Sequence, residues 1–274
     1  DLDDARDLLL NKNYKAIDIL YPSTTNVLSE LLRTAFEAPK GSKFVVSDFS
    51  AIEARVIAWF SNEKWRLDVF SGHGKIYEAS AAHMFNVPIE SIGKGSPLRQ
   101  KGKIAELALG YQGSTGALIQ MGALKMGLSE NELPELVSSW RKANPNIKKF
   151  WNDVDDSAMT AVRNKSVVKL NNLLFYYYKK CLFIKLPSGR ELCYLNPEIV
   201  KGKKFGNDVI RFIGLNQATK KFDYEETYGG KLVENIVQAT ARDCLAVALC
   251  RINAAGYKIV MHVHDEIIVE VWII

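Results

Sequence analysis

The sequence contains few cysteines, and it has no apolar run long enough to cross a membrane. Only four of its 274 residues are cysteines, and none forms a C-x-x-C pair, which suits a reducing compartment better than a disulfide framework or a zinc site. No uninterrupted apolar run approaches the ~20 residues of a membrane-spanning helix. Internal repeats and low-complexity linkers are also absent. These absences exclude a fibrous array and indicate a protein without a membrane span.

The composition is otherwise that of an ordinary globular protein. Charged residues make up 24% and aromatic residues 10% of the chain, which excludes wholesale disorder. The length fits one or two domains. The chain carries 36 basic and 31 acidic residues, and the resulting net charge of +5 permits a polyanionic partner without requiring one.

Apolar spacing in the first half of the chain predicts helices around one short strand. Residues 1–40 have the pattern of short helices. Residues 43–48 form an apolar run typical of a buried strand, and the stripe that follows predicts a helix beginning near Ser50. Helical patterns then dominate over residues 76–164.

The second half of the chain has strand patterns on both sides of a helix. In chain order we expect strands over 170–213 with a hairpin turn at Pro187-Ser188-Gly189, a helix over 225–255, and apolar strands over 257–264 and 267–274 that meet at Asp265 and Glu266. Strands near both ends, with helices between them, predict an α+β fold whose sheet is assembled from distant segments.

Acidic side chains interrupt two of the expected apolar strands. Asp48 ends the strand over 43–48, where a carboxylate is costly unless it is paired or bound to a metal. Alternatively, Asp48 caps the following helix, and Ser50 is an equally good cap. Asp265 and Glu266 lie between strongly β-forming runs, although aspartate is also common in tight turns. Adjacent strand residues point to opposite faces, so only one of these two acids can share a face with Asp48.

A basic stripe is expected on one helix of the central block. Arg99, Lys103, Leu107 and Tyr111 recur at a spacing of four, which places them on one helical face. The simplest interpretation is a solvated face whose cations bind nothing. A surface that binds a nucleotide explains the pattern better, because two cations would neutralise a triphosphate and Tyr111 would offer a ring to a base.

These three features together predict nucleotidyl transfer. Two aspartates on neighbouring strands can hold two divalent cations roughly 3.5–4 Å apart. Oxygen ligands and a phosphate-rich substrate favour Mg²⁺. The basic helix would bring the polyphosphate to these ions, and a hydroxyl would then attack the α-phosphorus in line.

The same segments resemble the three motifs of a known enzyme family. Residues 48–56 resemble motif A of the family A (DNA polymerase I-like) DNA polymerases, residues 99–111 resemble motif B, and residues 264–266 resemble motif C. Their order and separations also fit, and the segments are most similar to the phage and prophage branch. The resemblance extends from about Leu28 to Glu270.

The resemblance implies a role for individual residues. The implied metal ligands are Asp48, Asp265 and the backbone carbonyl of Phe49, with Glu266 as an accessory catalytic acid. The implied nucleotide-binding residues are Arg99, Lys103, Tyr111, Glu53, Tyr77 and Leu107, of which Glu53 crowds the sugar 2′ position and favours deoxyribonucleotides. The implied contacts with primer-template DNA are Gln238, His264, Arg190 and Arg33. Two Mg²⁺ ions are the implied cofactors, with Mn²⁺ as a substitute.

Three positions depart from the family pattern. Leu107 stands where the family usually has Phe or Tyr, and Gln112 replaces a glycine that commonly follows the tyrosine. Tyr77 occupies a place where many relatives have a histidine that contacts the β-phosphate. A phenol can donate a hydrogen bond there but carries no charge.

The resemblance also implies an organisation into subdomains. A palm, an antiparallel sheet with helices, is expected over residues 1–60 and 226–274. Mostly helical fingers are expected over 61–225, with a β-hairpin near 183–195. Too few residues precede motif A for a thumb or an exonuclease domain. We expect a monomer, encoded by a phage or prophage, that works on DNA and deoxynucleoside triphosphates in the host cytoplasm without contacting a membrane.

Alternative functions make different predictions. A degenerate or truncated remnant would bind nucleic acid without turnover, and the missing thumb motivates that hypothesis. An RNA polymerase or reverse transcriptase would share the palm, but Glu53 argues against ribonucleotide use. A metal-dependent hydrolase built from the same acids would leave the stripe from Arg99 to Tyr111 unexplained.

Overall fold

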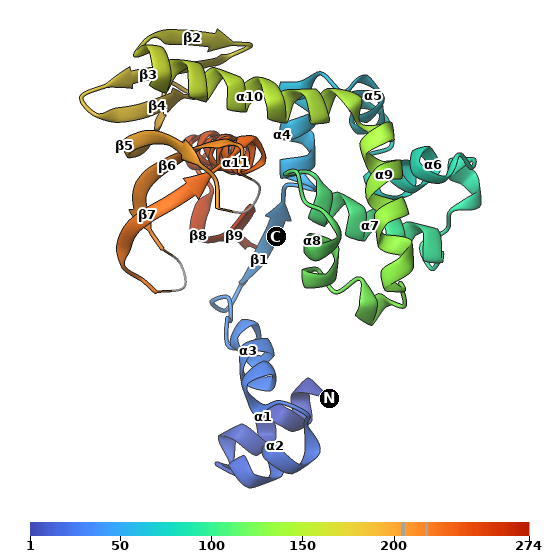
Figure 1. The fold of residues 1–274 in the computed structure, drawn as a ribbon. Coiled ribbons are helices and arrows are strands. Elements are labelled where there is room, and N and C mark those ends of the chain that lie inside the picture. The colour runs from blue at the N-terminus through green and yellow to red at the C-terminus, as the bar shows by residue number, and fades with distance from the viewer. Residues whose placement is uncertain (204–205, 217–218, 274) are drawn as a thin grey trace. The chain divides into compact units, whose positions relative to one another are not determined.

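The computed structural model describes residues 1–203, 206–216 and 219–273 (Figure 1). The chain forms two compact units: residues 1–48 together with 249–274, and residues 49–248. Each unit is described by itself below. Within the described ranges, no helix combines the length and the apolar character that a membrane crossing requires.

The smaller unit pairs short helices with a sheet. Its elements are α1 (Leu2–Leu10), α2 (Tyr14–Leu20), α3 (Thr24–Thr34), β1 (Ser42–Asp48), β8 (Lys258–Val263) and β9 (Glu266–Trp272). Asp1 and Asp4 form a capping box at the start of α1. Ala5, Ile17, Val27 and Leu31 form a small core between the helices. The short helices predicted over residues 1–40 are confirmed.

The sheet of this unit joins the two ends of the sequence. Its strand order is β1-β9-β8, and both pairs are antiparallel. The strands β8 and β9 form a hairpin whose turn contains Asp265. The prediction of a sheet assembled from distant segments, with a hairpin at the acidic pair, is therefore confirmed; Ile274, at the end of the expected last strand, lies outside the described residues.

The larger unit begins with helices. They are α4 (Ile52–Ser61), α5 (Lys64–Ser71), α6 (Ile76–Phe85), α7 (Pro97–Leu109), α8 (Thr115–Gln120), α9 (Leu133–Ala143) and α10 (Pro145–Asn164), with short 3-10 turns at Ile89–Ser91, Leu124–Met126 and Glu130–Glu132. Helix α11 (Gly229–Ala254) follows the strands, and its last residues belong to the smaller unit.

An antiparallel meander separates α10 from α11 in the sequence. Its strands are β2 (Val167–Leu170), β3 (Leu173–Tyr178), β4 (Cys181–Lys185), β5 (Glu191–Lys201), β6 (Asp208–Leu215) and β7 (Phe222–Thr227), paired in sequence order. The predicted hairpin is confirmed, since β4 and β5 pair on either side of Pro187-Ser188-Gly189. Residues 204–205, which lie within the expected strand region, are outside the described ranges.

The start of the predicted helix over 225–255 is wrong. Residues up to Thr227 form β7 and pair with β6, so the helix begins only at Gly229. The first residues of this helix pack closely against the backbone of other segments. A Cβ added to Gly229 would lie 2.2 Å from the backbone oxygen of Trp151, and one added to Gly230 would lie 2.5 Å from that of Tyr111.

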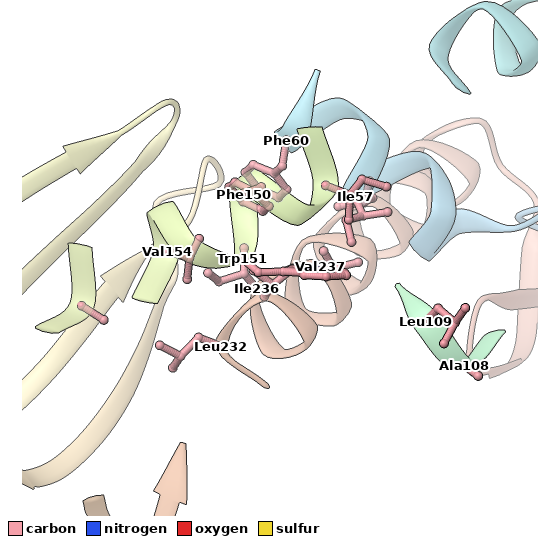
Figure 2. Packing of buried hydrophobic residues seen from close by; sticks show 14 of the residues in the cluster. Ile57, Phe60, Ala108, Leu109, Phe150, Trp151, Val154, Leu232, Ile236 and Val237 are labelled. Atoms are coloured by element: carbon pink, nitrogen blue, oxygen red, sulfur yellow. The ribbon is translucent and has the colours of Figure 1, made fainter. Parts of the chain in front are cut away.

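The core of the larger unit surrounds α10. Figure 2 shows Phe150, Trp151 and Val154 of this helix near Ile57 and Phe60 of α4 and near Ile236 and Val237 of α11. The rings of Phe60 and Phe150 stack with their centroids 5.7 Å apart. The indole of Trp151 also donates a 2.8 Å hydrogen bond to the backbone oxygen of Gly110, just after α7. This core therefore fixes where α7 ends.

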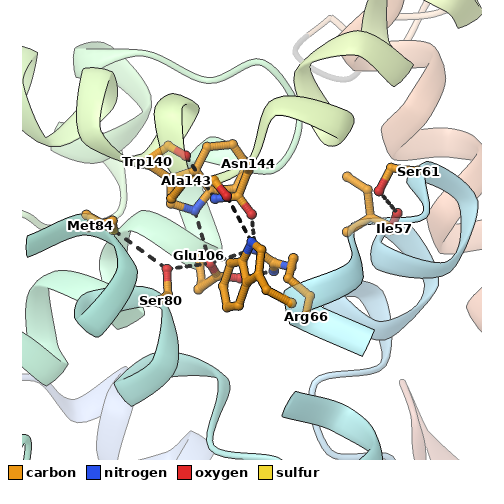
Figure 3. A network of polar contacts seen from close by, with 10 residues as sticks. Ile57, Ser61, Arg66, Ser80, Met84, Glu106, Trp140, Ala143 and Asn144 are labelled. Carbon is orange, nitrogen blue, oxygen red and sulfur yellow. Dashed lines mark hydrogen bonds and ion pairs between the residues drawn. The ribbon is translucent and has the colours of Figure 1, made fainter. Parts of the chain in front are cut away.

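A buried polar network holds the C-terminal half of α7 through Glu106 (Figure 3). The carboxylate of Glu106 on α7 accepts hydrogen bonds from Arg66 of α5 at 2.9 Å, Ser80 of α6 at 2.8 Å and Trp140 of α9 at 3.0 Å. A second, shorter contact makes the pair with Arg66 bidentate. Arg66 also donates to Asn144 at 2.9 Å. Because the side chains of Arg66 and Glu106 are 1% and 3% exposed, the pair is shielded from solvent.

Asp155→Asn is expected to stabilise the protein at pH 8 but not at pH 4. Burial raises the pKa of Asp155 on α10 to about 6, the charge of Asp156 adds to this, and the backbone N–H of Gly229 opposes it. The folded state thus binds more protons than the unfolded state between about pH 4 and pH 6, so its stability falls as the pH rises through that window. Asparagine can still accept the Gly229 hydrogen bond. Thermal unfolding should show a gain of about 1 kcal/mol at pH 8 after discounting for solvent screening, and an equal gain at both pH values would contradict this explanation.

Candidate active site

The acids at the ends of β1 and β9 lie next to one another. Asp48 is the last residue of β1 and Glu266 is the first residue of β9, and the two are partners in the antiparallel register. Cross-strand partners project from the same face of a sheet. Glu266 is therefore the acid that shares a face with Asp48. Asp265 precedes it in the turn, next to His264, whose φ of 53° is left-handed.

The capping interpretation of Asp48 and Ser50 is wrong. Helix α4 begins at Ile52, and its N-cap is Ala51, with a left-handed φ of 51° and no side-chain hydrogen bond. The N-cap position is therefore taken by a residue whose side chain cannot accept a hydrogen bond, and neither Asp48 nor Ser50 occupies it. Asp48 consequently has no capping role that would explain a carboxylate at the end of an apolar strand.

The electrostatics of this corner would favour a bound cation. Burial and the nearby charges of Asp265 and Glu266 raise the pKa of Asp48. The ion pair found for these acids joins Arg33 to Glu266 at 3.4 Å, and Arg33 is 70% exposed. The other oxygen of Glu266 is buried and has no hydrogen-bond partner among the described atoms. Oxygen donors with excess negative charge are the ligands that Mg²⁺ prefers. Among the described residues, no group of three or more His, Cys, Asp or Glu side chains is already arranged around a metal position.

Helix α7 carries three of the four residues in the predicted basic stripe. It runs from Pro97 to Leu109, with Gly110 as its C-cap, so Tyr111 lies beyond the helix rather than on it. The reason is packing: a Cβ at Gly113 would lie 1.9 Å from the backbone oxygen of Ala108, and this close contact folds the chain back on the helix. The prediction that Tyr111 continues the stripe on the helix is therefore wrong.

Tyr111 instead points inward to Glu53. Its hydroxyl donates a 2.5 Å hydrogen bond to Oε2 of Glu53 on α4, and its ring packs against the core. Burial, and then the charge of Glu53, raise the pKa of Tyr111 far above its ordinary value, so the phenol stays protonated. The two residues that the family resemblance places beside the nucleotide sugar and base are thus brought together.

The two cations of the predicted stripe, Arg99 and Lys103, lie in different environments on α7. Arg99 pairs with Glu78 of α6 at 2.7 Å, and its guanidinium carbon lies 5.5 Å from the ring centroid of Tyr77. Lys103, by contrast, has no hydrogen-bond or ion-pair partner in the described part of the chain. Leu107, one turn further, is 49% exposed. Arg99, Lys103 and Leu107 lie on α7, as their spacing predicts, and Tyr77 lies on the neighbouring helix α6.

The predicted DNA contacts fall in both units. In the larger unit, Gln238 is exposed on α11, and Arg190 of the β4–β5 turn donates to Asp243 at 2.8 Å and to the backbone oxygen of Ala239 at 2.7 Å. The hairpin is therefore fastened to the turn of α11 that carries Gln238. In the smaller unit, His264 is exposed beside Asp265.

Sequence reasoning missed Glu78 and Glu106. Both are acids that lie among small or apolar residues of a helix, at Glu78-Ala79 and Ala105-Glu106-Leu107. That local context was the available signal, because an acid on a face otherwise packed with alanine and leucine requires a buried partner. The partner itself cannot be identified from the sequence.

Comparisons with known proteins agree on one family. The sequence profile of DNA polymerase family A matches residues 13–180. A DNA polymerase of Bacillus phage SP02 is 60% identical over 272 residues, which cover 99% of this chain and 42% of that protein. The thermostable DNA polymerase I of Thermus aquaticus is 23% identical over 248 residues, covering 89% of this chain and 24% of that protein.

A solved structure shares the fold. The POL domain of Pol1 from M. smegmatis, solved in complex with DNA primer-template and dNTP, superposes with a TM-score of 0.57 at 20% identity, covering 92% of this chain and 37% of that chain. The chain spans less than half the length of the curated relatives described above. With more than half of its residues matched by the family profile, the chain belongs to DNA polymerase family A.

Proposed function

We propose that this chain carries the catalytic part of a template-directed DNA polymerase that adds deoxynucleotides to a primer 3′-hydroxyl. The observation that carries the proposal is the pairing of Asp48 with Glu266, beside Asp265, at one end of the β1-β9-β8 sheet. Segments from opposite ends of the sequence supply these acids. Membership of DNA polymerase family A supports a shared role for them in nucleotidyl transfer.

The acids would hold the catalytic ions. Asp48, Asp265 and the backbone carbonyl of Phe49 are the proposed ligands of two Mg²⁺ ions, with Mn²⁺ as a substitute. When bound, such ions activate the attacking hydroxyl and stabilise the charge of the leaving pyrophosphate. Glu266 supports the site from the same sheet face as Asp48, and Arg33 partly neutralises it.

Residues of the larger unit would bind the nucleotide. Arg99 and Lys103 supply positive charge for the triphosphate, while Tyr77 and Leu107 line the same helix pair. Glu53 would crowd the sugar 2′ position, and the hydroxyl of Tyr111 holds its carboxylate in place.

The proposed DNA contacts and subdomain boundaries are those implied by the resemblance to family A polymerases. Gln238, Arg190, His264 and Arg33 are proposed to contact primer-template DNA. We propose that the palm comprises residues 1–60 and 226–274 and that the fingers comprise 61–225. We further propose that the chain works in phage DNA replication in the cytoplasm of the host, a proposal that its similarity to a phage DNA polymerase supports.

Primer extension tests the proposal directly. The chain is incubated with a labelled primer annealed to a longer DNA template, deoxynucleoside triphosphates and Mg²⁺. We expect extension that follows the template sequence and stops when the metal is chelated. Binding of the primer-template without incorporation at high protein concentration would overturn the proposal in favour of a non-catalytic remnant.

Glu53→Ala is expected to increase ribonucleotide incorporation relative to deoxyribonucleotide incorporation by roughly 10²-fold, because it removes the side chain that crowds the 2′-hydroxyl. The ratio of kcat/KM for the two nucleotides measures the effect. Tyr111→Phe is the matched control, since it removes only the hydroxyl that holds Glu53 and should relax selectivity less. An unchanged ratio in Glu53→Ala would remove Glu53 from sugar selection.

A further inference from the structure

One nitrogen holds the Arg99 side chain. Its Nε donates to Oε1 of Glu78 at 2.7 Å, and no hydrogen bond or ion pair among the described residues engages its two terminal nitrogens. A guanidinium group binds phosphate best through a pair of N–H donors in its planar fork. The contact with Glu78 therefore leaves a pair of terminal donors available to bind phosphate.

The backbone around Glu78 also fixes this partner of Arg99. It lies in the first turn of α6, where unpaired backbone N–H groups and the helix dipole favour a carboxylate. Burial alone would raise the pKa of Glu78, but the hydrogen bond from Arg99, its own backbone N–H and the charges of Arg99 and Lys75 lower it overall. With Arg99 bound, the Glu78 carboxylate is therefore ionised at neutral pH, and its place in the first turn of α6 fixes its position.

Helix α6 also supplies a flat surface beside Arg99. The ring of Tyr77 lies 5.5 Å from the guanidinium carbon, a distance at which a cation is attracted to an aromatic face. The two helices pack closely at this point, because an added Cβ at Gly102 of α7 would lie 2.3 Å from the backbone oxygen of Tyr77 on α6. Tyr77 and Glu78 consequently hold a defined position relative to Arg99.

We propose that Glu78 is a positioning residue for the incoming nucleotide: it holds Arg99 at Nε and presents the two terminal nitrogens to the triphosphate. This inference rests on the proposed function, because it takes Arg99 as a triphosphate ligand. A long, flexible side chain that is already ordered loses less conformational entropy when it binds. The opposite role, a lock that must open before phosphate binds, predicts tighter nucleotide binding when Glu78 is removed.

The test combines nucleotide affinity with turnover in a double-mutant cycle. Glu78→Ala should raise KM for the deoxynucleotide about 10-fold with little change in kcat, because Arg99 must then be ordered during binding. Glu78→Gln retains an acceptor for Nε and should have a smaller effect. If Glu78 acts through Arg99, then Glu78→Ala should change KM no further in an Arg99→Ala background.

Matched controls separate this role from a loss of structure. Glu132→Ala also removes an acid that pairs with α7, at Lys101, but this acid does not contact Arg99, so KM should not change. Equilibrium binding of a fluorescent deoxynucleotide gives a readout that does not require turnover, so a failure of the proposed activity is distinguishable from a failure of this inference. Lower KM in Glu78→Ala, or an equal effect with and without Arg99, would overturn it.

Discussion

Asp48→Asn is expected to reduce the rate of primer extension by at least about 10³-fold, the scale of losing an electrostatic group aimed at the reacting atoms. Asparagine has nearly the same shape, but a neutral amide cannot hold a pair of divalent cations. Asp265→Asn should have a comparable effect. Single-turnover incorporation at saturating nucleotide measures the loss without interference from product release.

The same substitution should leave the fold intact or slightly more stable. The folded state raises the pKa of Asp48 above its ordinary value, so the ionised form is disfavoured by folding at neutral pH. Removing the charge also removes repulsion from Asp265 and Glu266. We therefore expect an unchanged or higher melting temperature together with lost activity, a combination that misfolding cannot produce.

Glu270→Gln is the matched control for this variant. Glu270 is an acid of β9, the strand that pairs with β1, and it lies opposite Phe44, toward the other end of the sheet from Asp48. It pairs with Lys258 at 2.8 Å, and its loss should change extension less than about 2-fold. If Asp48→Asn extends primers as well as the parent, or if Glu270→Gln impairs extension equally, the acids at the end of the sheet are not the catalytic site.

Local patterns were sufficient for much of the fold. The apolar run ending at Asp48 is β1, the two apolar runs around Asp265 are β8 and β9, and the turn at 187–189 joins β4 to β5. Each of these elements is specified by neighbouring residues. The pairing of β1 with β9 could also be anticipated, because both runs are apolar and each needs a partner strand.

The errors occurred where a distant contact decides the outcome. Residues 222–227 became a strand because β6 lies beside them, and the sequence around Tyr224 is too short to show a clear period. Tyr111 does not continue the helical stripe, because the chain packs closely against α7 at Gly113 and Ala108. Its hydroxyl donates a hydrogen bond to Glu53 instead. In both cases long-range packing outweighed local periodicity.

The residues of the candidate site also fall into those that the sequence indicated and those that it did not. Asp48, Glu266, Arg99 and Lys103 were identified from residue type and spacing, supported by a resemblance to known motifs. Glu78 and Glu106 were not, since charged residues on amphipathic helices usually face solvent. Only the three-dimensional structure shows that Glu106 pairs with Arg66, which lies 40 residues earlier in the sequence. Side-chain pairing across helices is set by geometry that no single segment encodes.

Arg66→Met is expected to destabilise the protein by about 3–5 kcal/mol, the cost of leaving a buried charge without its partner. The carboxylate of Glu106 would keep hydrogen bonds from Ser80 and Trp140 but would lose the cation that neutralises it. Denaturant unfolding at neutral pH measures the effect. Arg163→Met is the control, because its ion pair with Asp208 is long and exposed, and its loss should cost less than about 1 kcal/mol.

A second substitution distinguishes an unpaired charge from a lost side-chain volume. Adding Glu106→Gln to Arg66→Met removes the buried charge, while the amide oxygen still accepts from Ser80 and Trp140. Because Nε of Arg66 is itself buried without a partner among the described residues, the native pair is not fully satisfied and its loss is recoverable. We expect the double variant to regain most of the stability lost in the single variant. If it is no more stable, packing around Arg66, rather than its charge, holds α7 in place.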